Sequence, residues 1–113
     1  MKLCDYTLDN LSGEKNSPNE ATQQLLLDQL PEWQIIHKDD VDQLFCQFKC
    51  ENFVSAMNLA SAITQIAEQA DHHPTLVIEW GKVSVYWWSH WLKGLHINDF
   101  ILAYKTQELH HIL

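Results

Sequence analysis

Positive charge is scarce in this sequence. Its 113 residues include 7 lysine and arginine residues against 15 aspartate and glutamate residues, which gives a net charge of −8 at pH 7 with histidine neutral. The lysines occur singly, so the chain has no basic cluster that could neutralise the phosphates of a nucleic acid. We therefore expect no direct binding to DNA or RNA.

Cysteine is also scarce, and long apolar runs are absent. Cys4, Cys46 and Cys50 include no CxxC pair, which is unlike a zinc site, and we expect ordinary reduced thiols. No apolar run approaches the ~20 residues of a membrane span, and the N-terminus lacks a signal-peptide pattern. These absences favour a cytoplasmic protein without membrane contact, and the length suits one domain with its own core.

The first half of the chain predicts a flexible lead-in, a helix and two strands. Residues 1–16 are polar and are expected to form the flexible lead-in, with a single domain over 17–113. Ser17, Pro18 and Glu20 have the spacing of a helix start, so we expect a helix that is capped by Ser17 and runs to about Leu30. Two short strands, 33–38 and 44–50, should flank an acidic turn at 39–42.

The second half predicts a long helix, a hairpin and a closing helix. Apolar residues recur at steps of three and four over 53–70, after Asn52 as a candidate N-cap. Strands at 75–80 and 83–90 surround Gly81-Lys82, and an amphipathic helix follows Gly94. The order α-β-β-α-β-β-α predicts an α+β fold, with a four-stranded antiparallel sheet and three helices on one face.

The hairpin brings histidines together. A turn at Gly81-Lys82 would pair Trp80 with Val83 on the buried face and place His73 opposite His90 on the other, mixed face. His72 is adjacent, and Glu68 precedes it by one helical turn. Because imidazole titrates near neutral pH, three converging rings and a carboxylate favour a proton-handling site.

Other interpretations of the histidines stay open at this point. A single histidine more often has a structural or surface role. Three histidines with a carboxylate could instead bind zinc, although the adjacent His72 and His73 tend to diverge on an extended chain. We expect His37 and His96 at the surface. His110 and His111 should lie on a solvated tail.

These residues match a known signature. The pattern Glu68-x3-His72-His73-Pro74-x5-Trp80-x9-His90-x8-Asp99 resembles that of the pterin-4a-carbinolamine dehydratases, and the resemblance covers about residues 20–107. It implies the same α+β fold and the dehydration of 4a-hydroxytetrahydrobiopterin to quinonoid dihydropterin, which recycles the cofactor of aromatic amino acid hydroxylases. It also implies a pterin substrate, no metal or organic cofactor, and a homodimer or homotetramer.

The resemblance also implies roles for individual residues. His72 and His90 would exchange protons with the substrate, and His73 would complete the catalytic set by binding and orienting the pterin. Asp99, in the first turn of the last helix, would be structural. Many members have a threonine where Ser89 stands and a threonine or serine cap where His96 stands, so the helix start could be looser here. The residues expected to bind substrate are Glu68, Trp80, Trp88 and Ser89.

Two other functions remain open. Some animal relatives bind a homeodomain transcription factor as dimerisation cofactors, so a non-catalytic adaptor is one alternative. A pterin-binding protein of another pathway, such as molybdopterin metabolism, is the other, because the same pocket would recognise a related ring.

Overall fold

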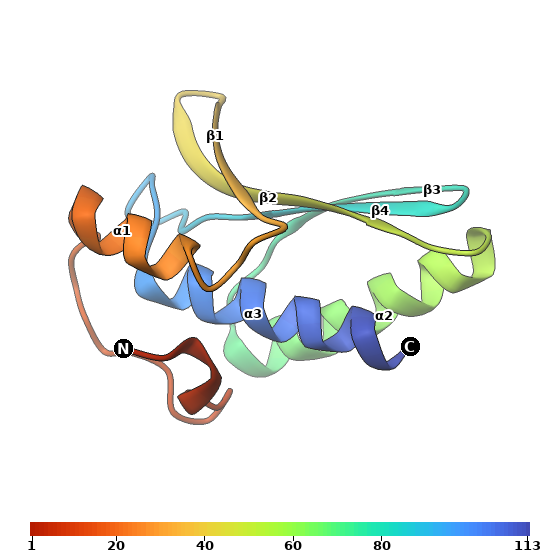
Figure 1. Cartoon of the computed structure of the whole chain (residues 1–113), viewed down its shortest axis with the longest axis horizontal. Coiled ribbons are helices and arrows are strands. Elements are labelled where there is room, and N and C mark those ends of the chain that lie inside the picture. Colours follow the sequence, from red (N-terminus) through yellow and green to blue (C-terminus); the bar gives the residue numbers. More distant parts are fainter.

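One antiparallel sheet lies against a layer of helices (Figure 1). The computed structural model describes all 113 residues, and its element order confirms the predicted α-β-β-α-β-β-α arrangement. None of the helices has the length and apolarity needed to cross a membrane. The elements are the 3-10 helix η1 (Leu3–Asp5), α1 (Glu20–Leu27), β1 (Gln34–Lys38), β2 (Val41–Lys49), α2 (Phe53–Ala70), β3 (Thr75–Glu79), β4 (Lys82–Trp87) and α3 (Ile97–Ile112).

The four strands stand in the order β1-β2-β4-β3, and every neighbouring pair is antiparallel. β1–β2 and β3–β4 are hairpins, and α2 carries the chain from β2 to β3 at the opposite edge of the sheet (Figure 1). The β1–β2 turn consists of Asp39 and Asp40, which both have positive φ, as a type I′ turn requires. This topology leaves β1 and β3 as edge strands.

The register of the second hairpin differs from the prediction by two residues. Glu79 pairs with Lys82, so the turn consists of Trp80 and Gly81, and Gly81 supplies a φ of +78° at the second turn position. Trp80 therefore does not face Val83 on the buried side; it is 72% exposed in the turn. A shift of two residues leaves the side chains of the paired strand residues on their predicted faces, because side chains alternate with period two.

The core lies between the sheet and the helices. Trp87, Val85 and Val83 of β4 pair with Leu44, Cys46 and Phe48 of β2, and all six side chains are buried. Three of the five buried residues of α2 are alanines, and such small side chains allow a helix to pack closely on a sheet. The buried helical residues that complete this core include Ala56, Leu59, Ile63, Ala67, Phe100, Ile101, Leu102 and Ala103.

Helix caps define where the helices begin. Asn52 is the N-cap of α2, as predicted, and its side chain accepts a hydrogen bond from the Ser55 amide at 2.8 Å. The prediction was wrong for α1: Asn19 rather than Ser17 is the N-cap, accepting from the Thr22 amide at 2.8 Å, and the helix ends at Leu27 rather than near Leu30.

The first 16 residues, expected as a flexible lead-in, pack onto the domain. Leu3 is fully buried in the core, and its amide donates to the Gln29 side chain at 2.9 Å. Further along, the Ser12 amide donates to Asn98 Oδ1 of α3 at 2.9 Å. This segment is thereby tied to the start of α3, which also carries Asp99.

Candidate active site

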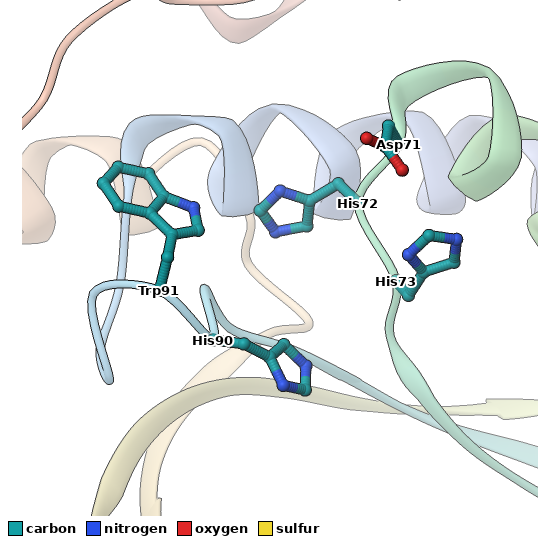
Figure 2. Close-up of a pocket in the computed structure, with 5 residues that line it drawn as sticks. All are labelled: Asp71, His72, His73, His90 and Trp91. Atoms are coloured by element: carbon teal, nitrogen blue, oxygen red, sulfur yellow. The ribbon is translucent and has the colours of Figure 1, made fainter.

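The end of α2 turns the chain so that two histidines enter a pocket. Asp71 adopts the left-handed conformation at φ 51°, and the amide of His72 donates back to the Ala67 carbonyl at 3.1 Å, which closes the helix in a Schellman-type turn. His72 and His73 follow directly. The cavity has a volume of about 280 Å³ and is lined by Asp71, His72, His73, His90 and Trp91 (Figure 2).

His72 is the anchored imidazole of the site. Its Nε2 lies 2.6 Å from Oδ1 of Asp99, whose side chain is fully buried, while the His72 side chain is 12% exposed. The other carboxylate oxygen of Asp99 accepts from Ser89 Oγ at 2.7 Å and from the His96 amide at 2.8 Å. Since a carboxylate can only accept, His72 Nε2 is the donor in this hydrogen bond, and Nδ1 makes no hydrogen bond within the chain.

His73 has a different carboxylate partner. Its Nε2 lies 2.5 Å from Oε2 of Glu68, which stands on the last turn of α2. Both side chains are more than half exposed, at 55% and 69%, so the pair contributes little to folding stability but orients the ring beside the cavity. Glu68 does not itself line the cavity. It instead holds His73, which lines the cavity.

His90 enters the pocket from the segment that follows β4. Its ring stacks on Trp88, with ring centroids 3.9 Å apart and planes 22° apart. Backbone hydrogen bonds between Ser89 and Gly94 in both directions close the loop that presents His90 and Trp91. The ring is exposed and makes no side-chain hydrogen bond within the chain, so both nitrogens can meet a ligand.

The three histidines line one cavity, but not because of the cross-strand pairing that the sequence predicted. Pairing of β3 with β4 begins at Thr75 with Tyr86, and this register would set His73 opposite Trp88 rather than His90. His90 reaches the cavity because it lies in the loop after the sheet, not because it is a cross-strand neighbour. The adjacent rings of His72 and His73 turn to separate carboxylates, and no group of three or more histidine, cysteine or acidic side chains has the arrangement of a metal site.

None of the four residues expected to bind substrate lines the cavity: Glu68 holds His73, Trp88 stacks on His90, and the other two lie elsewhere. Trp80 is in the β3–β4 turn, at the far end of β3 from His73, and does not line the cavity. Ser89 is 1% exposed, and its hydroxyl donates to Asp99, so it supports that carboxylate. Asp71 and Trp91 line the cavity but were not singled out, although each directly adjoins a signature histidine in the sequence.

Two histidines outside the signature make more contacts with the folded domain than predicted. His96, expected at the surface, is 1% exposed and caps α3. His110 donates from Nε2 to the Lys49 carbonyl at 2.8 Å and packs on Phe48, so it belongs to the folded end of α3 rather than to a solvated tail. His37 is exposed beside Asp42, as expected.

Known proteins share both the sequence and the fold. Residues 14–109 match the family described as pterin 4 alpha carbinolamine dehydratase. Three relatives carry the name "Putative pterin-4-alpha-carbinolamine dehydratase". The one from Chlorobium luteolum is 48% identical over 80% of this chain and 79% of its own, and the one from Marinobacter nauticus is 42% identical over 88% and 89%. The relative from Vibrio cholerae is 47% identical over 77% of this chain and 80% of its own.

A solved structure has the same architecture. The crystal structure of a transcriptional coactivator/pterin dehydratase from Brucella melitensis superposes with a TM-score of 0.76 at 26% sequence identity, covering 83% of this chain and 98% of that one. The match over most of the chain, together with the high identities of the relatives, establishes the relationship. The chain therefore belongs to the pterin-4a-carbinolamine dehydratase family.

Proposed function

We propose that this chain dehydrates a 4a-hydroxytetrahydropterin to the quinonoid dihydropterin and so returns a tetrahydropterin cofactor to aromatic amino acid hydroxylases. The observation that carries the proposal is the meeting of three imidazoles at one cavity of about 280 Å³ (Figure 2). That volume lies just below the ~300 Å³ lower bound of ordinary small-molecule sites, so it suits a compact bicyclic ring rather than a larger ligand.

The reaction requires two proton transfers. The C4a–O bond breaks as the hydroxyl receives a proton and leaves as water, and N5 loses its proton as the N5–C4a double bond forms. A proton donor and a proton acceptor that work near neutral pH are therefore sufficient. We assign these transfers to His72 and His90, because both rings line the cavity and each keeps at least one nitrogen free of hydrogen bonds within the chain.

The remaining groups hold the substrate and the acid–base pair in place. His73, oriented by Glu68, would bind and orient the pterin, and Trp91 offers an exposed aromatic surface at the other side of the cavity. Trp88 acts through His90, against which it stacks. Asp99 and Ser89 act through His72, because neither lines the cavity and the carboxylate contacts the ring directly.

Alanine substitutions test this division of roles. With freshly generated substrate and correction for the uncatalysed reaction, His72→Ala and His90→Ala should each lower kcat by ~10²–10⁴-fold. His73→Ala should raise KM more than it lowers kcat. His37→Ala is the matched control, because His37 also pairs with a carboxylate but lies on the β1–β2 hairpin outside the cavity.

The result that would contradict the proposal is equally specific. Folded His72→Ala and His90→Ala proteins with wild-type kcat would reduce the imidazoles to packing and binding groups. Absence of turnover by the wild-type chain would favour a non-catalytic adaptor, the alternative suggested by the coactivator name of the Brucella structure. Turnover only of a differently substituted pterin would favour another pterin pathway.

A further inference from the structure

His96 lies beside the candidate site, and both of its ring nitrogens are hydrogen-bonded. Its side chain is buried, and both ring nitrogens have backbone partners. Nδ1 accepts from the Asn98 amide at 3.0 Å, and Nε2 lies 2.5 Å from the Glu14 carbonyl oxygen. An amide N–H can only donate and a carbonyl can only accept, so the ring is the neutral tautomer with its proton on Nε2.

The two partners of this ring belong to different parts of the chain. The Nδ1 bond caps the first turn of α3, while the Nε2 bond reaches back over 82 residues to the N-terminal segment. The same segment donates from the Ser12 amide to the side chain of Asn98. His96 therefore joins the start of α3 to residues 12–14.

This junction bears directly on the candidate site. The backbone amide of His96 donates to Asp99 Oδ2 at 2.8 Å, which completes a capping box, and the other oxygen of that carboxylate holds His72. The His96 ring also packs against Trp91, with centroids 5.3 Å apart, and Trp91 lines the cavity. His96 thus contacts both Trp91, which lines the cavity, and Asp99, which holds His72.

We propose that His96 is a positioning residue, whose cap on α3 sets the Asp99–His72 geometry. The ring does not line the cavity, so its effect on His72 passes through Asp99. The kinetic part of this inference rests on the proposed dehydratase function. A serine at this position could keep the cap through its hydroxyl, but its side chain is too short to reach the Glu14 carbonyl as well.

The two bonds of the ring can therefore be separated by substitution. His96→Ala removes both, and His96→Ser restores the cap alone. We expect kcat to fall by about 10- to 100-fold in His96→Ala, because small displacements of a catalytic group are costly, and KM to change by less than about threefold. His96→Ser should recover kcat to within about threefold of the wild type. If His96→Ala does not fold, His96→Gly replaces it, since glycine is better tolerated than alanine at an N-cap.

A second measurement does not depend on turnover. The proton on His72 Nε2, hydrogen-bonded to Asp99, should give a downfield imidazole resonance in the proton NMR spectrum of the free protein. We expect the resonance to shift or disappear in His96→Ala and to be retained in His96→Ser. This arm tests the positioning role even if the wild-type chain does not dehydrate the pterin.

Asn19→Ala is the matched control. It removes the N-cap of α1, which also accepts one backbone hydrogen bond, but α1 contributes no residue to the cavity. This variant should be destabilised without loss of kcat or of the His72 resonance. The proposal is overturned if folded His96→Ala, or the glycine variant in its place, keeps wild-type kcat and an unchanged resonance, or if Asn19→Ala produces the same losses.

Discussion

Asp99→Asn is the substitution that most directly tests how the site holds His72. The carboxylate accepts from three donors: His72 Nε2, Ser89 Oγ and the His96 amide. Asparagine keeps the shape but replaces one acceptor oxygen with an NH₂ group. The amide oxygen must stay with the Ser89 and His96 donors, because the backbone N–H of His96 cannot accept. The NH₂ group then faces His72 Nε2, so that nitrogen becomes an acceptor and its proton moves to Nδ1.

The expected magnitudes follow from these contacts. Hydrogen bonds to a charged group contribute more than neutral ones, so replacing the carboxylate should lower the free energy of unfolding by about 1–3 kcal/mol. For a domain of this size that corresponds to a fall in Tm of roughly 4–12 °C. The effect on catalysis should be larger, because moving the proton from Nε2 to Nδ1 changes which ring nitrogen can donate to the substrate or accept from it. We expect kcat to fall by ~10²–10⁴-fold.

The assay combines background-corrected dehydration kinetics with thermal unfolding and the ¹⁵N resonances of His72, which report its tautomer. Thr106→Val is the control on the same helix. It removes a buried hydroxyl that accepts from Trp87 Nε1 at 3.1 Å, about two turns from Asp99. It should cost similar stability and keep kcat within about threefold. The reasoning fails if folded Asp99→Asn retains wild-type kcat with unchanged His72 resonances, or if Thr106→Val loses as much activity.

Four further outcomes are expected. Sedimentation at micromolar concentration should show a homo-oligomer, because β1 and β3 leave unpaired edges, and a sole 13.2 kDa species would contradict this. Exhaustive chelation should leave turnover unchanged, because His72 and His73 face separate carboxylates, whereas a loss restored only by zinc would refute it. Burial, and secondarily the charge of Glu32, raise the pKa of Cys46 to about 12. An unfolded thiol ionises near pH 8.5, so the free energy of unfolding should fall by up to about 1.4 kcal/mol per pH unit as pH rises above that value. Urea unfolding at pH 8 and 10 should show a smaller pH-dependent loss of stability in Cys46→Ala than in the wild type. Gly81→Ala should cost about 1–2 kcal/mol in urea unfolding because of its φ of +78°, whereas Gly13→Ala, whose added Cβ would meet nothing within 4 Å, should not.

Local patterns in the sequence were sufficient for the order of elements. The three- and four-residue spacing of apolar residues in 53–70 and the capping side chain of Asn52 act within a few residues of each other, so they could be recognised without the fold. The alternation of side chains in the second hairpin likewise assigned the correct faces. The exact register was not determined locally, because Gly81 can occupy either central position of a two-residue turn and only the pairing in the sheet selects one.

The histidine signature predicted His72, His73 and His90 as site residues, and all three line one cavity, but tertiary structure decided how each is held. The sequence predicted that Asp99 stabilises the helix dipole of α3. In the structure it is buried against His72, 27 residues away in the chain, because α3 packs beside the end of α2. His96 reads as a surface residue, and its burial depends on the Glu14 segment folding across the start of α3. Local periodicity reports contacts between near neighbours in the chain. The partners of these two side chains are set by long-range packing, which no local pattern encodes.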